Sequence, residues 1–129
     1  MDKECILIVE SDILIRQPLA EYLRECGYVV MESLNPSEAR ELLSKGDREA
    51  DIVFAEIEGF DGGGFALSKW IRENHPNVEV ILAGTVSKAV EEAGDLCREG
   101  PAISKPYDHS FVLDRIRASL AARNRRNKT

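Results

Sequence analysis

The chain has 129 residues, 43% of them hydrophobic and 31% charged, which fits one globular domain and excludes a disordered, collagen-like or repeat protein. Its apolar runs are far shorter than the roughly 18 residues of a membrane span, and no secretory signal is recognisable, so we expect a cytoplasmic protein that does not enter the membrane. The net charge is -6, but six of the 17 basic residues follow Asp114, so that residues 1–114 carry 11 basic and 23 acidic side chains, a net charge of -12. Because so acidic a body repels phosphates, we do not expect it to bind nucleic acid.

Short continuous apolar runs alternate with segments of helical periodicity along the whole chain. In chain order the expected elements are a strand over Cys5–Val9, a helix over Ile13–Cys26, a strand over Tyr28–Met31, a helix from Pro36 to about Ser44 and a strand over Ile52–Ile57. They are followed by a helix over Phe65–Asn74, a strand over Val78–Ala83, a helix over Ser87–Leu96, a strand over Pro101–Ser104 and a helix from about Ser110 to Ala122. This alternation predicts an α/β fold with a single doubly wound, five-stranded parallel sheet and helices on both faces.

Capping residues mark the beginnings of two of these helices. Asn35 and Glu38 have the spacing of an N-cap and a capping-box acid, and Asp108 can cap the last helix. With no long linker in the chain, we expect residues 1–122 to form one domain and residues 123–129 to be a basic tail or the start of a linker.

Acidic side chains and one lysine are expected at the carboxyl edge of this sheet. Parallel α/β sheets bind ligands and perform chemistry beyond the carboxyl ends of their strands. The residues at these ends are Glu10, Ser11 and Asp12 after the first strand, Glu56 on the third, Gly84 and Thr85 after the fourth and Lys105 after the fifth. The sequence therefore predicts that the acids and the lysine lie close together.

Three segments, in this order, resemble the receiver domain of bacterial two-component response regulators. They are Ile6-Leu7-Ile8-Val9-Glu10-Ser11-Asp12, Asp51-Ile52-Val53-Phe54-Ala55-Glu56 and Lys105-Pro106-Tyr107. The resemblance covers residues 4 to about 122, and it implies the flavodoxin-like fold of CheY-like receivers and a role in phosphorelay signalling rather than enzymatic catalysis. In the family, the proline that matches Pro106 follows a cis peptide bond that directs the lysine, here Lys105, toward the phosphorylation site.

The chain departs from the family at the phosphorylation site. Glu56 stands where the family has its phosphate-accepting aspartate, and Glu10 and Ser11 stand where it has a pair of acids for Mg2+. The extra methylene of Glu56 displaces its carboxylate, and a misplacement of roughly 1 Å can reduce a rate about a hundredfold. Ser11 removes one anionic ligand, so we expect Glu10 and Glu56 to hold Mg2+ weakly if at all, unless Asp12 replaces the lost acid. We therefore assign no catalytic residue and no required cofactor, and we expect Glu56 to pair with Lys105 as a permanent anion.

The positions that couple the site to the surface in the family are also altered. Its hydroxyl residue after the fourth strand aligns with Gly84, or with Thr85 after a shift of one residue, and its aromatic switch residue aligns with Ala102. Without these groups we expect no phosphate-driven rearrangement of the surface. The family commonly contacts partners through the surface that corresponds here to about Ser87–Ala122, so we expect a histidine kinase or an effector there. Association of two copies stays open.

Together these expectations favour an atypical receiver domain that signals by protein–protein contact, with phosphorylation weakened or absent. One alternative is a receiver that still accepts a phosphoryl group from a histidine kinase with Mg2+, on Glu56 or another acid. The other is a flavodoxin-like cofactor binder, which has less support because no Ser/Thr-rich phosphate loop follows the first strand.

Overall fold

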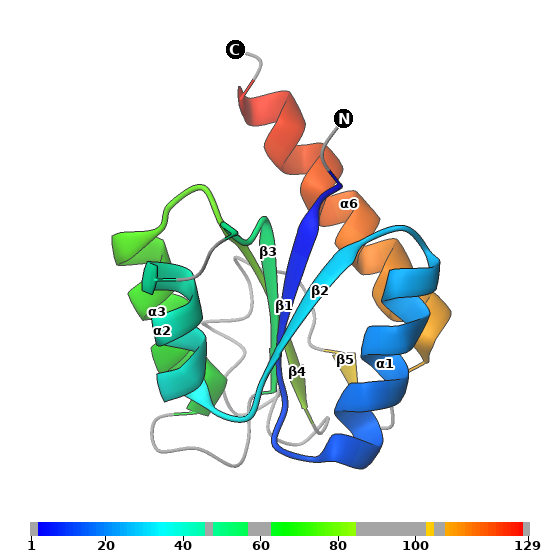
Figure 1. Cartoon of the computed structure of the whole chain (residues 1–129). Coiled ribbons are helices and arrows are strands. Elements are labelled where there is room, and N and C mark those ends of the chain that lie inside the picture. Colours follow the sequence, from blue (N-terminus) through cyan, green and yellow to red (C-terminus); the bar gives the residue numbers. More distant parts are fainter. Residues whose placement is uncertain (1–2, 46–47, 57–62, 85–102, 105–107, 128–129) are drawn as a thin grey trace.

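The centre of the molecule is one parallel sheet with the strand order β2-β1-β3-β4-β5 (Figure 1). The computed structural model describes residues 3–45, 48–56, 63–84, 103–104 and 108–127. The strands are β1 (Cys5–Val9), β2 (Val29–Ser33), β3 (Ile52–Glu56), β4 (Glu79–Gly84) and β5 (Ile103–Ser104). All four neighbouring pairs are parallel, so the predicted fold class is confirmed.

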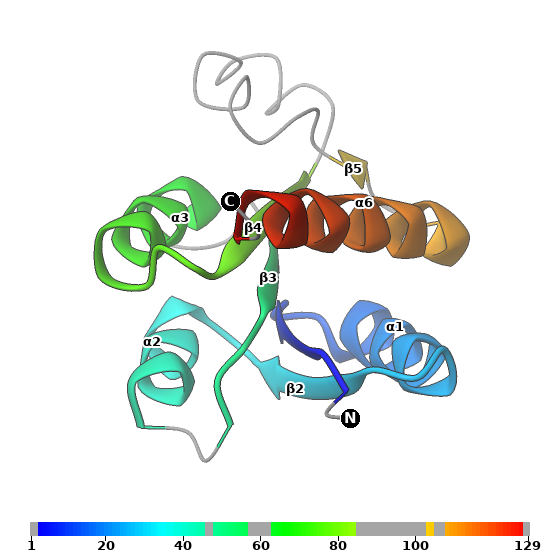
Figure 2. The same cartoon turned by 90° about the horizontal axis from the view of Figure 1, so that it is seen from above.

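Helices cover both faces of the sheet. The described helices are α1 (Ile13–Glu25), α2 (Pro36–Lys45), α3 (Gly63–Asn74) and α6 (His109–Asn127). Figure 2 shows α1 and α6 on one face and α2 and α3 on the other. The predicted helix over Ser87–Leu96 lies outside the described residues.

Strand β1 contributes side chains to the hydrophobic clusters on both faces of the sheet, and this explains why its sequence is apolar at every position. Its five residues are all 0% exposed. Ile6 and Ile8 belong to the core cluster beneath α1 and α6, whereas Leu7 and Val9 belong to the cluster beneath α2 and α3. A strand buried on both faces needs apolar side chains at every position.

The predicted caps are present. The backbone N–H of Glu38 donates to Oδ1 of Asn35 at 2.9 Å, and Oε1 of Glu38 accepts from the backbone N–H of Leu34 at 2.8 Å. At the start of α6, the hydroxyl and the backbone N–H of Ser110 both donate to Asp108 Oδ1. The hydroxyl bond is the main reason that the pKa of Asp108 lies below its ordinary value of 3.8.

The last helix is longer than the sequence pattern predicted. Instead of ending near Ala122, α6 continues to Asn127. Its final turns are held to the amino edge of the sheet, where Arg123 Nη1 lies 3.0 Å from Asp51 Oδ1 and Arg126 pairs with Glu79. The predicted domain boundary at residue 122 therefore falls within a helix.

Strand β2 begins and ends later than the predicted Tyr28–Met31. Its last residue, Ser33, pairs with Val9, and the Ser33 hydroxyl donates to the carbonyl oxygen of Ile8 at 3.0 Å. Polar residues are accepted here because β2 lies at an edge of the sheet.

Within the described ranges, no helix has the length and apolar character needed to cross a membrane.

Candidate functional site

Two buried carboxylates lie side by side at the carboxyl edge of the sheet. Val9 of β1 pairs with Ala55 of β3, which places the next residues, Glu10 and Glu56, at the same level on adjacent strands. Glu10 is 1% exposed and Glu56 is 3% exposed. Because buried carboxylates are stable only with compensating partners, the neighbouring donors determine what this site can do.

Ser11 supplies two of these donors to one oxygen of Glu56. The backbone N–H of Ser11 donates to Glu56 Oε2 at 2.8 Å, and the Ser11 hydroxyl lies 3.2 Å from the same oxygen. The position at which the sequence predicted a lost acid is therefore occupied by a hydrogen-bond donor to Glu56.

Asp12 is used as a helix cap. Its carboxylate is exposed, and Oδ1 accepts from the backbone N–H of Leu14 at 2.9 Å, at the start of α1. Its own backbone N–H donates to Glu10 Oε2 at 3.1 Å. The Asp12 carboxylate is thus engaged with the helix, while its amide helps to hold Glu10.

Gly64 permits the start of α3 to approach the end of β3. A Cβ at this position would lie 2.5 Å from the backbone oxygen of Glu56. Only glycine allows so close an approach without a shift of the backbone. The sequence has three consecutive glycines at positions 62–64, and the folded structure determines that Gly64 faces Glu56.

The donors present fit a hydrogen-bonded carboxylate better than an octahedral Mg2+ site. In the described part of the chain, no three His, Cys, Asp or Glu side chains gather as metal ligands. Glu56 Oε2 already accepts two hydrogen bonds from Ser11. Mg2+ demands near-ideal octahedral geometry with carboxylate and water ligands.

Several predicted site residues lie outside the described residues. Gly84 ends β4 and pairs with Ser104 of β5. The four others, Thr85, Ala102, Lys105 and Pro106, are not described. The expected pairing of Glu56 with the lysine therefore stays a prediction.

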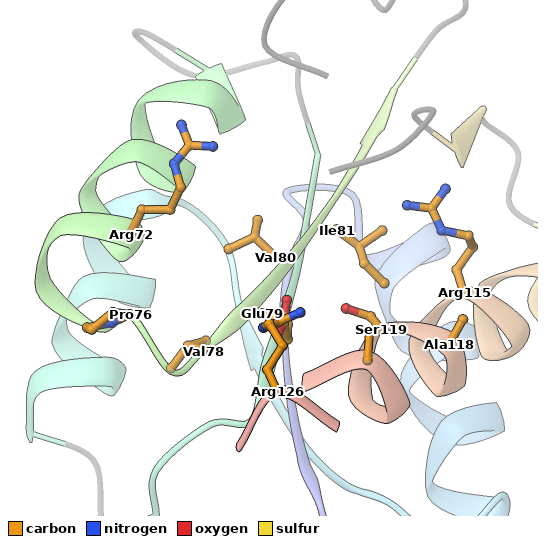
Figure 3. Close-up of a pocket in the computed structure, with 11 residues that line it drawn as sticks. Arg72, Pro76, Val78, Glu79, Val80, Ile81, Arg115, Ala118, Ser119 and Arg126 are labelled. Carbon is orange, nitrogen blue, oxygen red and sulfur yellow. The ribbon is translucent and has the colours of Figure 1, made fainter. Parts of the chain in front are cut away.

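A second concave region lies away from the acidic edge, alongside β4 between α3 and α6 (Figure 3). Its volume is about 490 Å³, and its lining combines apolar residues such as Val78 and Val80 with the cations Arg72, Arg115 and Arg126. Burial lowers the pKa of the Arg115 guanidinium below its ordinary value. Among the described residues that line this groove, Glu79 is the one acid, and it is paired with Arg126.

The sequence between Ile6 and Arg117 matches the family model described as the response regulator receiver domain. The chain belongs to this family. The match includes β1 and β3, the two strands whose carboxyl ends lead to or bear the buried Glu10 and Glu56.

Two curated relatives are bacterial regulators. The chain is 28% identical over 119 residues to the transcriptional regulatory protein GltR of Pseudomonas aeruginosa, which covers 89% of this chain and 48% of GltR. It is 26% identical over 126 residues to the response regulator protein PilR of the same organism, which covers 96% of this chain and 28% of PilR. The chain thus spans about half or less of the length of these relatives.

Solved receiver structures share the fold. The signal receiver domain of an HD domain-containing protein from Pseudomonas fluorescens Pf-5 superimposes with a TM-score of 0.82 at 25% identity, covering 95% of this chain and 98% of that one. A CheY-like receiver domain protein from Methanospirillum hungatei JF-1 gives a TM-score of 0.84 at 20% identity, covering 97% and 99%. The CheY-like receiver architecture expected from the resemblance is confirmed.

Proposed function

We propose that this chain is an atypical receiver domain that acts in two-component signalling through contact with a protein partner, with phosphoryl transfer weakened or absent. The observation that supports this most strongly is the double hydrogen bond from Ser11 to Glu56 Oε2. The family and the receiver fold give the signalling context, and this contact is the feature of the chain that supports weakened phosphoryl transfer.

Phosphoryl transfer to a receiver requires a carboxylate oxygen in line with the donor and a cation that offsets developing charge. Two hydrogen bonds to Glu56 Oε2 stabilise the carboxylate and make that oxygen a weaker nucleophile. Ser11 adds no anionic ligand for Mg2+, and Asp12 is engaged in capping α1. These features favour a site whose negative charge is balanced by protein donors, with Lys105 as a further partner of Glu56.

Partner contact is supported by exposed apolar side chains. Phe111, within the predicted Ser87–Ala122 surface, is 51% exposed, and Leu14 at the start of α1 is 81% exposed. Large apolar side chains on a surface are typical of protein contact sites when they gather in one region. Receiver domains contact histidine kinases and effector domains, and we propose a partner of this kind, in the cytoplasm, for a domain that includes α6 as far as Asn127.

The test is incubation with acetyl phosphate and Mg2+, followed by intact mass. We expect no phosphoryl adduct on the wild-type chain. The double variant Glu56→Asp, Ser11→Asp should gain a Mg2+-dependent adduct, because the first change corrects the reach of the acceptor and the second supplies a metal ligand. Glu56→Gln is the negative control for labelling elsewhere.

Three outcomes would contradict the proposal. A stoichiometric, Mg2+-dependent adduct on the wild-type chain would support the alternative of a phosphorylatable receiver. Full phosphorylation of Glu56→Asp alone would show that Ser11 does not disable the metal site. Visible absorbance of the purified protein would instead favour a flavodoxin-like cofactor binder.

A further inference from the structure

Arg16 is a buried cation next to the candidate site. It lies in α1 and is 9% exposed. Its Nη1 donates to the backbone oxygen of Glu10 at 2.9 Å, and its Nε donates to Glu32 Oε1 of β2 at 3.1 Å. The planar guanidinium of arginine is suited to bridging two acceptors in this way.

The carbonyl that Arg16 binds belongs to the same peptide group as the Ser11 N–H. This peptide group accepts from Arg16 through the Glu10 oxygen and donates to Glu56 Oε2 through the Ser11 nitrogen. Because the peptide is planar and its C=O and N–H are normally trans, fixing one end orients the other. A cation on the carbonyl also polarises the amide and strengthens its N–H as a donor.

The same short loop is fixed by backbone contacts on both sides of this peptide group. The Glu10 N–H donates to the Ser33 oxygen at 3.1 Å, and the Arg16 N–H donates to the Asp12 oxygen at 2.9 Å. These contacts hold the ends of the loop. Between these ends, the side chain of Arg16 binds the Glu10 carbonyl.

Arg24 provides a natural comparison on the same helix. It also pairs with Glu32, at 3.1 Å, and it donates to the backbone oxygen of Val30. Its contacts lie along β2 and do not involve the Glu10–Ser11 peptide group. The two arginines share one carboxylate partner, but only one of them contacts the candidate site.

We propose that Arg16 is a positioning residue that orients and polarises the Glu10–Ser11 peptide group toward Glu56. It forms the middle of a chain of contacts from Glu32 on β2, through Arg16 and the peptide group, to the acceptor-equivalent carboxylate. This assignment rests on the proposed function for its relevance to signalling, but the contact itself is testable without Mg2+ or a phosphodonor.

The experiment is amide hydrogen exchange by NMR on the whole chain, with Arg16→Met, Arg16→Lys and Arg24→Met. Exchange at Ser11 is compared with exchange at Ile8 in the same sample, because Ile8 lies in the middle of β1 and reports opening of the sheet. In Arg16→Met we expect the Ser11 amide to exchange roughly tenfold faster relative to the Ile8 amide. This is the factor expected when one hydrogen bond to a charged group is lost. Its amide proton should also move upfield, in the direction produced by Glu56→Gln.

The controls separate positioning from general loss of stability. Arg24→Met should leave the ratio of Ser11 to Ile8 exchange unchanged, since it removes a Glu32 pair without touching the loop. Arg16→Lys keeps one cationic donor for the Glu10 carbonyl, so it should restore most of the Ser11 protection that Arg16→Met loses. If Arg16→Met does not fold, Arg16→Lys should still show a larger change at Ser11 than Arg24→Met.

The assignment is overturned if Arg16→Met leaves the exchange ratio and the Ser11 shift unchanged, or if Arg24→Met alters them equally. For an unfolded Arg16→Met, equal effects of Arg16→Lys and Arg24→Met overturn it. Phosphorylation of the wild-type chain would refute the proposed function but would not change these comparisons, so the two failures are distinguishable.

Discussion

Replacing Gly64 with alanine tests how tightly α3 packs against the end of β3. The added Cβ would lie 2.5 Å from the backbone oxygen of Glu56 and 3.2 Å from Cδ2 of Leu82. Favourable contacts between carbon atoms lie at about 3.5–4.0 Å, so both distances are too short. Because the first neighbour is backbone at the end of a buried strand, the start of α3 must move away from Glu56.

The magnitude follows from two opposing effects. Overpacking of a core costs about 1–3 kcal/mol, whereas alanine gains up to about 1 kcal/mol over glycine in a helix interior and less in a first turn. We expect Gly64→Ala to lower the free energy of unfolding by about 1–2 kcal/mol. The one tryptophan, Trp70, lies in α3, so its fluorescence can follow urea unfolding.

Gly27→Ala is the matched control. Gly27 has a φ of 102°, and a Cβ there meets no atom of the described residues within 4 Å. The substitution should cost about 1–2 kcal/mol through backbone strain alone. The amide resonances of Ser11 and Glu56 should move in Gly64→Ala and stay in place in Gly27→Ala. Unchanged stability together with unchanged site resonances in Gly64→Ala would refute the reasoning.

Three other perturbations address the sheet. Asp51→Ala should lower the free energy of unfolding by about 2–3 kcal/mol in urea, because Asp51 accepts hydrogen bonds from the Cys5 N–H at 2.7 Å and from Arg123 at 3.0 Å. A decrease near zero would show that water readily replaces both bonds. Ser33→Ala removes the hydroxyl bond to Ile8 and should cost about 1 kcal/mol by the same assay. Burial raises the pKa of the Cys5 thiol above its ordinary value of 9.0, so the unfolded chain releases this proton first. The free energy of unfolding should therefore fall as pH rises above about 9, and less steeply in Cys5→Ala, when urea midpoints are compared across that range.

The elements that the sequence predicted best are those specified by local signals. The bounds of β1 were predicted as observed, because charged residues flank an apolar run that is buried on both faces. The caps at Asn35 and Asp108 were also predicted, since an N-cap acts within a few residues. Contacts between residues that are close in the chain can be predicted from the sequence.

Features that depend on distant parts of the chain could not be predicted. Asp51 directly precedes β3, and it contacts Arg123, which is 72 positions away. The same contact explains why α6 continues beyond Ala122, where its apolar periodicity fades. Arg16 belongs to this class too, because its partners come from the end of β1 and from β2.

The sequence predicted where Glu10 and Glu56 lie, but it predicted only part of the hydrogen bonding around them. The sequence indicated that Glu10 and Glu56 meet at the carboxyl edge, and the strand register places them side by side. From the sequence, Ser11 was interpreted only as the loss of an acidic side chain. That the Ser11 amide and hydroxyl converge on one oxygen of Glu56 depends on side-chain geometry, which residue spacing does not supply.

Ser11 and Glu56 are best understood as a coupled pair of residues. An acid at position 11 would bring a second carboxylate to Glu56 Oε2, which lies 3.2 Å from the Ser11 hydroxyl, and two like charges so close require a metal ion or a proton between them. A serine instead donates to that oxygen, and the longer glutamate side chain extends far enough from β3 to accept both donors. An aspartate at position 56 would be one methylene shorter and would withdraw from Ser11. Ser11 and Glu56 are therefore matched to each other in length and in hydrogen bonding, and the protein's own donors hold the pair together.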